Sequence, residues 1–232
     1  MSGWWDADGA ISGCVAAYQP IGAASLAASY SNLANPGTYN AAPGVAPTFN
    51  TATGWAFNGT TQYLTTGVTP ANDQTWSVLV RFSDGATQGG GGAAAFGSYR
   101  TTGGVRRFYY ITHYTDNNAY VSNGGQSARS PGIDSGVVGF RGAQPVRNGS
   151  DDGAALAAGA AGAHGPIALG SANNPDEGAK LYWNGKIQAI AIYSAVLTAG
   201  EIATLTTLMG ALPVASAKGL PIIAHYHRQV WG

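Results

Sequence analysis

The sequence predicts one all-β globular domain with a single short helix near its C-terminal end. Short apolar runs recur along the chain and are punctuated by Gly, Pro and Asn, which is the pattern of an all-β domain. The run Trp76 to Phe82 alternates apolar with mostly polar residues, and this period of two is typical of a strand. At 198–212, a helix-capping motif is followed by apolar residues at helical spacing. A length of 232 residues suits one large β domain.

The first part of the chain is expected to be extended structure joined by turns. Residues 26–47 carry Asn-Pro-Gly and Pro-Gly turn signals and are interpreted as one long extended segment. Residues 54–57 and 62–64 flank an Asn58-Gly59 turn, which predicts a hairpin. A strand at 74–83 follows. Its period of two places four residues on the face that we expect to point into the core: Trp76, Val78, Val80 and Phe82.

The second half of the chain contains further strand patterns separated by a long loop. Residues 105–114 are rich in aromatic residues, and because both faces are partly apolar, the sequence leaves open which face points inward. Residues 137–146 predict another strand. The Ala- and Gly-rich stretch 151–165 predicts a loop, and a buried helix is the less favoured alternative because four glycines interrupt it. Strands are also expected at 167–170 and 186–193. The latter is apolar on both faces, which indicates a central strand.

One helix is predicted after the last of these strands. Thr198 and Glu201 form a capping box, in which the Thr side chain bonds the third amide and the Glu side chain bonds back. Helical spacing then relates five apolar residues: Ile202, Leu205, Leu208, Met209 and Leu212. Pro213 marks the expected end of the helix.

The chain carries unusually little charge. Only 9% of its residues are Asp, Glu, Lys or Arg, and eleven basic residues balance eleven acidic ones, whereas about 25% is typical. A neutral chain lacks the basic surface that binds a nucleic-acid backbone or an anionic membrane, so neither partner is expected. Small uncharged polar groups must coat the surface, which suits protein assemblies and sugar contacts.

Other classes are excluded by what the sequence lacks. Cys14 is the only cysteine, so no intrachain disulfide and no cysteine zinc site can form. The N-terminus does not have the pattern of a signal peptide, and no apolar stretch is long enough for a transmembrane helix. Asn58 and Asn148 each begin a sequence that matches a glycosylation sequon. Because both sequons contain Asn-Gly, we interpret them as hairpin turns in preference to glycosylation sites.

Three stretches resemble the concanavalin A-like lectin/glucanase superfamily, and laminin G-like domains in particular: 55–64 with 76–82, 145–149 with 167–170, and 183–202. The first is similar to the family's F-x-G-x-x-x-Y hairpin and the second to its V-N-G hairpin. The third is the most specific and is similar to the closing signature G-x-I followed by I-Y and L-T-x-x-E-I. The resemblance implies an antiparallel two-sheet β-sandwich of jelly-roll order, with the short helix after the final strand.

The same resemblance sets the expected organisation. Residues 1–50 would be an N-terminal extension with the first strands, 51–212 the laminin G-like sandwich, and 213–232 a C-terminal arm. The opening 16–26 is similar to laminin G-like proteins encoded by tailed phages. Gln188 stands where the family often carries Asp, so the resemblance does not support an inherited calcium site, and we expect no cofactor.

Catalytic and metal-binding motifs are missing or incomplete. The glucanases of the superfamily use an E-x-D-x-x-E strand, but Glu177 and Glu201 are the only glutamates here and are far apart. The adjacent carboxylates at 151–152 and 176–177 are interpreted as solvated loop residues, because strand neighbours point to opposite faces. His225 and His227 have no evident third ligand. We therefore predict that the protein is not an enzyme, and a glycoside hydrolase is the least favoured alternative.

A group of tyrosines is the best candidate for binding a sugar. Aromatic rings pack on the apolar face of a pyranose while neighbouring amides bond its hydroxyl groups. The residues expected to contribute are Tyr99, Tyr109, Tyr114 and Tyr120, with Asn117, Asn118 and Asn123 on intervening loops. The alternative interpretation is that most of these tyrosines belong to the core or its rim.

Two functional hypotheses follow. The first is a non-enzymatic, lectin-like structural or accessory protein of a virus particle, which forms a homo-oligomer or contacts other particle proteins at a virion or extracellular surface. Terminal aromatic residues would form its interfaces, namely Trp4, Trp5, Tyr226 and Trp231. The second is a carbohydrate-binding module that attaches to cell-surface glycans. A decoration protein that also binds glycans would satisfy both.

Overall fold

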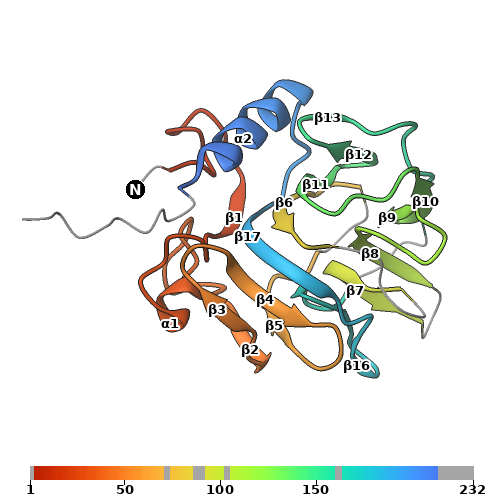
Figure 1. Cartoon of the computed structure of the whole chain (residues 1–232). Coiled ribbons are helices and arrows are strands. Elements are labelled where there is room, and N and C mark those ends of the chain that lie inside the picture. The colour runs from red at the N-terminus through yellow and green to blue at the C-terminus, as the bar shows by residue number, and fades with distance from the viewer. Residues whose placement is uncertain (1–2, 71–73, 86–91, 102–104, 160–163, 214–232) are drawn as a thin grey trace, which may run out of the picture.

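The fold consists of two β-sheets packed face to face, with one helix against the outside of the first sheet (Figure 1). The computed structural model describes residues 3–70, 74–85, 92–101, 105–159 and 164–213. The strand pairings are antiparallel except for one bridge between β15 and β7. The predicted all-β sandwich with a short C-terminal helix is therefore confirmed. None of the described helices is long and apolar enough to span a membrane.

Sheet 1 runs from one edge to the other through β13 (Ser150–Asp151), β12 (Gln144–Arg147), β11 (Gly136–Arg141), β6 (Ser77–Ser83), β17 (Asn184–Tyr193), β4 (Gly54–Asn58) and β3 (Thr48–Asn50). Strand β1 (Cys14–Tyr18) pairs with the second half of β17. Because β17 pairs with β6 along one side and with β4 and β1 along the other, the predicted central position of this strand is confirmed.

Sheet 2 runs through β10 (Gly125–Arg129), β9 (Ala119–Asn123), β8 (Arg106–Ile111), β7 (Ala94–Arg100), β14 (Ala168–Leu169), β5 (Tyr63–Thr65) and β2 (Ala42–Val45). Strands β15 (Ala172–Asn174) and β16 (Gly178–Lys180) form a hairpin beside β7. The strands β7 to β10 follow one another as a meander, so residues close in sequence line one continuous part of this sheet.

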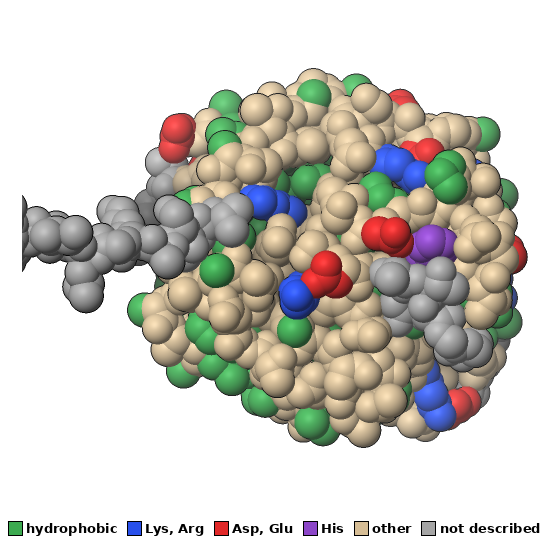
Figure 2. All heavy atoms as spheres, in the orientation of Figure 1, with side chains coloured by type: hydrophobic (Ala, Val, Ile, Leu, Met, Phe, Trp, Pro, Cys, Tyr) green, Lys and Arg blue, Asp and Glu red, His purple; other side chains and the backbone are tan. Residues whose placement is uncertain are grey.

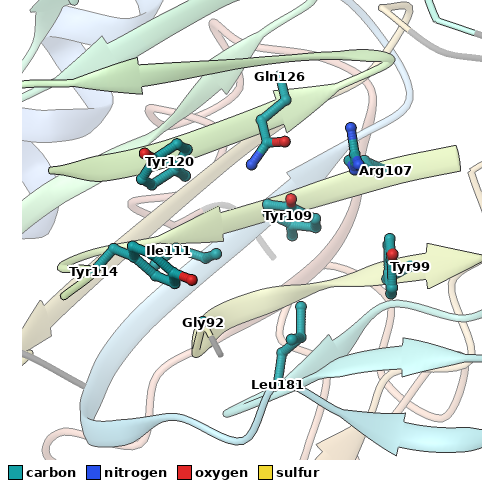
Figure 3. A pocket seen from close by; sticks show the side chains of 9 residues that line it. All are labelled: Gly92, Tyr99, Arg107, Tyr109, Ile111, Tyr114, Tyr120, Gln126 and Leu181. Atoms are coloured by element: carbon teal, nitrogen blue, oxygen red, sulfur yellow. The ribbon is translucent and has the colours of Figure 1, made fainter. Parts of the chain in front are cut away.

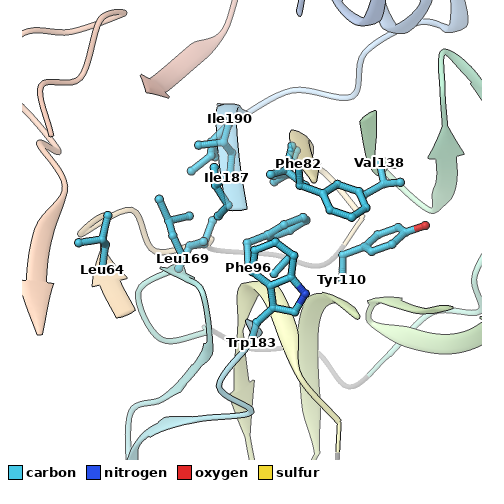
Figure 4. Packing of buried hydrophobic residues seen from close by; sticks show 14 of the residues in the cluster. Leu64, Phe82, Phe96, Tyr110, Val138, Leu169, Trp183, Ile187 and Ile190 are labelled. Atoms are coloured by element: carbon cyan, nitrogen blue, oxygen red, sulfur yellow. The ribbon is translucent and has the colours of Figure 1, made fainter. Parts of the chain in front are cut away.

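The space between the sheets is filled by large apolar side chains (Figure 4). Val78, Val80 and Phe82 of β6 point into it, with Trp76 packed against its edge, so the predicted inward face is confirmed. Trp183 is fully buried, and its Nε1 donates to Thr112 Oγ1 at 2.9 Å. This buried indole therefore satisfies its polar atom while it packs between the layers.

Helix α2 (Ala199–Ala211) covers the outside of sheet 1. The capping box of Thr198 and Glu201 is present as predicted. Leu79 of β6, which faces away from the inter-sheet core, packs in one cluster with Leu205 and Met209 of the helix. Both faces of sheet 1 are thus buried, because the helix supplies the apolar cover that the outer side chains need.

The predicted hairpin at 54–64 is wrong. Strand β4 pairs within sheet 1, whereas β5 pairs within sheet 2, so this stretch crosses from one sheet to the other. The Asn58 side chain accepts hydrogen bonds from the backbone N–H groups of Thr60, Thr61 and Gln62. This side chain turns the chain tightly without bringing the two strands into one ladder.

Two further predictions need correction. Residues 137–146 form two antiparallel strands, β11 and β12, because Gly142 adopts a φ of 55° and lets the chain reverse. The segment 26–47 is not extended throughout. It begins with helix α1 (Leu26–Ser29), and the Ser25 side chain caps the Ala28 N–H.

Trp4 belongs to the chain's own interior, and Trp5 is partly buried beside it. Trp4 is 9% exposed and packs in the cluster beneath α2, with Trp5 in edge-to-face contact at 6.0 Å. The Trp5 carbonyl accepts a hydrogen bond from the Tyr193 hydroxyl at 2.7 Å. The expectation that Trp4 is an exposed interface anchor is therefore wrong, because the cluster around α2 buries it. Tyr226 and Trp231, like the His225 and His227 pair, lie outside the described residues.

Replacing Leu205 by Ala is expected to destabilise the fold by about 2–5 kcal/mol, because this fully buried side chain joins α2 to sheet 1. Thr207→Ala is the matched control, since Thr207 is exposed on the same helix and a change there should stay within about 0.5 kcal/mol. Urea denaturation of both variants measures the difference. Equal midpoints for the two variants would show that the helix does not pack on the sheet.

Candidate functional site

The outer face of sheet 2 carries a small cluster of buried apolar residues, with partly buried tyrosines packed against it, that no helix covers within the described residues. Along β8, Phe108 and Tyr110 point into the inter-sheet core, so Arg107, Tyr109 and Ile111 point outward. The question that the sequence left open for this strand is thereby answered, since each of its faces packs in a different cluster. The outward set lies at the centre of the candidate site.

A pocket of about 300 Å³ lies on this face (Figure 3). Nine residues line it: Gly92, Tyr99, Arg107, Tyr109, Ile111, Tyr114, Tyr120, Gln126 and Leu181. Most come from β7, β8, β9 and β10, and the strand register places them side by side. Tyr99 stands opposite Arg107 in the β7–β8 pair, and Ile111 stands opposite Tyr120 in the β8–β9 pair. The meander therefore gathers residues of four consecutive strands on one surface.

The four tyrosines form two aromatic pairs, one toward each end of the pocket (Figure 3). Tyr114 and Tyr120 meet edge to face with ring centroids 5.3 Å apart and an interplanar angle of 75°. Tyr99 and Tyr109 are 6.3 Å apart at 69°. Such edge-to-face pairs stabilise one relative orientation of the rings, so the aromatic surface is ordered before any ligand arrives.

Two glycines shape the space around Tyr109. Gly97 stands opposite Tyr109 in the ladder, and a Cβ atom there would lie 2.4 Å from the Tyr109 Cβ. At Gly92, which has a φ of 85°, a Cβ would lie 3.2 Å from the end of the Ile111 side chain. Larger residues at these positions would press on the pocket's central side chains.

The turn after β8 holds the Tyr120 end of the pocket in place. The Tyr120 hydroxyl donates to Asp116 Oδ2 at 2.7 Å, and the Asn118 backbone N–H donates to Oδ1 at 3.0 Å. The hydrogen bond from Tyr120, followed by those from Asn118, lowers the pKa of the Asp116 carboxyl below its usual range. Asp116 therefore stays ionised at neutral pH and keeps its hold on the Tyr120 hydroxyl.

The predicted asparagines lie outside the pocket lining. Asn117 Oδ1 is 3.3 Å from His113 Nε2, while His113 Nδ1 is 2.7 Å from Asp134, so Asn117 belongs to the supporting turn. Asn118 takes part in that turn through its backbone. Asn123 is buried and bridges the Gln74 N–H and the Gly142 carbonyl. The structure thus brings the four predicted tyrosines together and separates the asparagines from them.

Sequence reasoning missed five of the lining residues: Gly92, Arg107, Ile111, Gln126 and Leu181. The alternation along 105–114 carried a usable signal, because it places Arg107 and Ile111 on the same face as Tyr109. Gln126 reaches the site only through the pairing of β10 with β9. No local pattern marks Leu181.

A second hollow of about 380 Å³ lies between α2 and sheet 1 and includes Arg81 and Gln188. Arg81 donates to the carbonyl oxygens of Met209 and Leu212 at the end of the helix, so its positive charge stabilises the C-terminus of α2. Within the described residues, no group of three or more His, Cys, Asp or Glu side chains could hold a metal ion.

The adjacent carboxylates singled out in the sequence are held in separate surface ion pairs. Asp151 pairs with Arg141 at 2.7 Å, and Asp152 pairs with Arg147 at 3.0 Å. In the second pair of neighbours, Asp176 bonds Arg100 and Glu177 approaches Lys180. Each carboxylate thus has its own cation, as expected for surface residues outside a catalytic site.

No protein-family model and no curated protein matches this chain. Solved structures do resemble it. A Trypanosoma rangeli sialidase in complex with sialic acid has a TM-score of 0.60 at 13% identity, over 84% of this chain and 32% of the sialidase. A mutant of that sialidase with trans-sialidase activity has a TM-score of 0.54 at 13% identity, over 85% and 33%.

Domain 4 of a GH43 extracellular arabinanase from Geobacillus stearothermophilus, in complex with arabinotriose, is also similar. Its TM-score is 0.51 at 13% identity, over 83% of this chain and 98% of that domain. This chain spans about a third of the length of the sialidases but nearly the whole arabinanase domain. At such identities the similarity shows the fold, a two-sheet β-sandwich, and nothing finer.

The burial of Tyr109 predicts a loss of stability at alkaline pH. Burial raises the pKa of Tyr109 to about 12. Because a folded-state pKa above the unfolded value favours the neutral form, this stabilisation is complete below about pH 10 and is lost as pH rises to about 12. Urea denaturation should therefore give a smaller free energy of unfolding at about pH 11 than at about pH 8.

Tyr109→Phe isolates the contribution of this one hydroxyl. The variant should lose roughly 1 kcal/mol less than the parent between those two pH values, because Phe has no group to ionise. Burial also raises the pKa of Tyr18, Tyr110 and Tyr193, so part of the loss persists in the variant. An identical pH dependence in both proteins would mean that Tyr109 titrates as an exposed tyrosine.

Proposed function

We propose that this chain is a non-enzymatic carbohydrate-binding β-sandwich and that the tyrosine pocket on sheet 2 is its binding site. The observation that carries the proposal is the gathering of four tyrosines around one pocket on a face that no described helix covers. Tyrosine rings supply apolar surface for the carbon face of a sugar, and their hydroxyl groups bond its polar edge. Gln126 and Arg107 add further hydrogen-bond donors.

The size of the pocket and its chemistry fit a small polar ligand. A volume of about 300 Å³ is at the lower end of the range for small-molecule sites, roughly 300–1,000 Å³. The similar arabinanase domain was solved with arabinotriose, an oligosaccharide. That likeness adds support because the domain matches nearly over its full length, and it motivates an arabino-oligosaccharide as one of the first ligands to test.

We propose binding without hydrolysis. Most glycosidase families use two carboxyl groups on either side of the scissile bond, roughly 5–10 Å apart; sialidases, which use a tyrosine nucleophile, are an exception. None of the nine residues that line the pocket is Asp or Glu, and Asp116 contacts the lining only through the Tyr120 hydroxyl. A sugar in this pocket would find aromatic surface and hydrogen-bond donors but no acid–base pair.

Binding to an array of immobilised oligosaccharides, followed by calorimetry with the strongest ligand, tests the proposal. Tyr99→Ala and Tyr114→Ala are each expected to weaken binding about tenfold, because each removes one ring of an aromatic pair. Both tyrosines are only partly buried, so the fold should survive. Tyr39→Ala, at an exposed tyrosine that does not line the pocket, is the control and should bind normally.

A second candidate function is a structural role at the surface of a virion, as a laminin G-like decoration or appendage protein. The observation that favours it is the low charge of the surface. Figure 2 shows few Lys, Arg, Asp or Glu side chains on the face in view, in line with 9% charged residues in the chain. Weak electrostatic repulsion between copies permits close assembly. A glycan-binding site on such a particle would serve attachment to an extracellular surface.

The native mass in solution tests the assembly role. Light scattering of the whole chain is expected to give a defined homo-oligomer, and removal of residues 214–232 is expected to reduce its mass, because those residues hold the aromatic tail. The N-terminal residues should be kept, since Trp4 belongs to the core. A monomer at every concentration would contradict the assembly role and leave the carbohydrate-binding role as the single proposal.

A further inference from the structure

Arg107 is the one charged residue among the nine that line the pocket. It lies near Tyr99 at one end, while Tyr114 and Tyr120 lie at the other end with Tyr109 between them (Figure 3). The other eight lining residues are uncharged. Any ligand in the pocket therefore meets a positive charge at the Arg107 end.

Arg107 differs from the other arginines of the described structure, because it makes no hydrogen bond or ion pair to an acceptor there. The five arginines with defined partners bond carboxylates or backbone carbonyls: Arg81, Arg100, Arg129, Arg141 and Arg147. Arg106, the neighbour of Arg107 on β8, also has a partner. Arg107 is half-buried, and its guanidinium has no acceptor among the described residues.

A planar guanidinium with five donors is best matched by a carboxylate, which accepts two parallel hydrogen bonds and neutralises the charge. A neutral sugar hydroxyl can accept one hydrogen bond but leaves the charge uncompensated. The vacant donors of Arg107 therefore favour an anionic partner over a neutral one.

The opposite end of the pocket has the opposite preference. Arg107 and Ile111 are four residues apart on β8, which corresponds to about 14 Å along the strand, and Ile111 stands opposite Tyr120. The Tyr120 hydroxyl is bonded to the Asp116 carboxylate. An anion at that end would be repelled by Asp116, whereas at the Arg107 end it lies more than a Debye length from this carboxylate at physiological salt. The two ends thus set the direction in which a charged oligosaccharide would lie.

From these contacts we infer that the pocket selects an oligosaccharide with a carboxylated unit, a uronic acid or a sialic acid, and that Arg107 binds the carboxylate. The inference rests on the proposed carbohydrate-binding function and gives it a ligand class. The carboxylated ring lies at the Tyr99 end and uncharged rings extend over Tyr109 toward Tyr114 and Tyr120. Arg107 acts as the residue that decides specificity, while the tyrosines supply affinity for both charged and neutral sugars.

Calorimetry with two pairs of ligands tests the inference. Trigalacturonate is compared with neutral galactotriose, and sialyllactose with lactose. The unaltered protein should bind at least one carboxylated ligand about tenfold more tightly than its neutral counterpart, and this preference should shrink as salt is added. The ligand pair that shows the preference identifies whether the pocket selects a uronic acid or a sialic acid.

Arg107→Gln should abolish the preference, because it removes the charge; it should weaken binding of the carboxylated sugar about tenfold more than binding of its neutral counterpart, for which Gln still offers a hydrogen-bond donor. Arg106→Gln is the matched control, because it removes the same charge from the adjacent residue on the opposite face of β8, and it should keep the preference. Circular dichroism and urea denaturation of both variants confirm that the fold is intact.

Failure of this inference is distinguishable from failure of the proposed function. If the neutral sugars bind as tightly as the charged ones and Tyr99→Ala weakens both, the pocket binds carbohydrate but does not select a carboxylate. If Arg107→Gln retains the preference, another group recognises the anion and the inference is overturned. If none of the four ligands binds and the glycan array is also blank, both proposals fail.

Discussion

The alternation of side chains along β8 is the constraint on which the architecture of the site depends. Phe108 and Tyr110 point into the space between the sheets, where Phe108 meets Phe140 of sheet 1 edge to face at 4.8 Å. These contacts fix the register of β8, because a shift by one residue would exchange every inward side chain for an outward one. Arg107 and Tyr109 can face the pocket only because their neighbours are held in the core.

The two outer faces of the sandwich differ in what covers them: a helix packs on sheet 1, whereas no described helix packs on sheet 2. The outer face of sheet 2 is therefore the one available for binding. Sheet 1 buries Leu79 and its outer neighbours beneath α2 and the N-terminal segment that includes Trp4. Sheet 2 has a much smaller apolar cluster around Tyr109 and Ile111, and no described helix lies over it. Tyr109 and Ile111 are buried, whereas Tyr99, Tyr114 and Tyr120 around them stay partly exposed. A group of partly exposed aromatic rings can mark a binding site. The rim of hydroxyl and amide groups keeps this surface soluble while leaving it open to an amphipathic ligand.

The features that could be predicted from the sequence are those whose physical cause lies in residues close together in the chain. The capping box at Thr198 and the alternation at Trp76 to Phe82 involve neighbouring residues, and both predictions are confirmed. The hairpin at 54–64 was wrong because strand partners are distant in sequence, and an Asn-Gly turn cannot show that β4 pairs with β17. The cluster of aromatic residues in the sequence predicted which tyrosines line the pocket. Gln126 lines it only because β10 pairs with β9, and no local sequence pattern encodes that pairing.

The structure assigns rigidity and adaptability to different parts of the pocket. The tyrosines are held by edge-to-face contacts, by the Asp116 carboxylate and by strands on both sides, so a ligand would order few side chains and lose little affinity to entropy. Arg107 begins from an equally rigid strand, but its long side chain has no acceptor in the described part of the chain and can follow the position of an anion. Under the proposed function, fixed rings with one adjustable charge would bind related sugars through a common surface and separate them by charge. The apolar faces of sugar rings resemble one another far more than their charged substituents do, so specificity would come from Arg107 and affinity from the tyrosines.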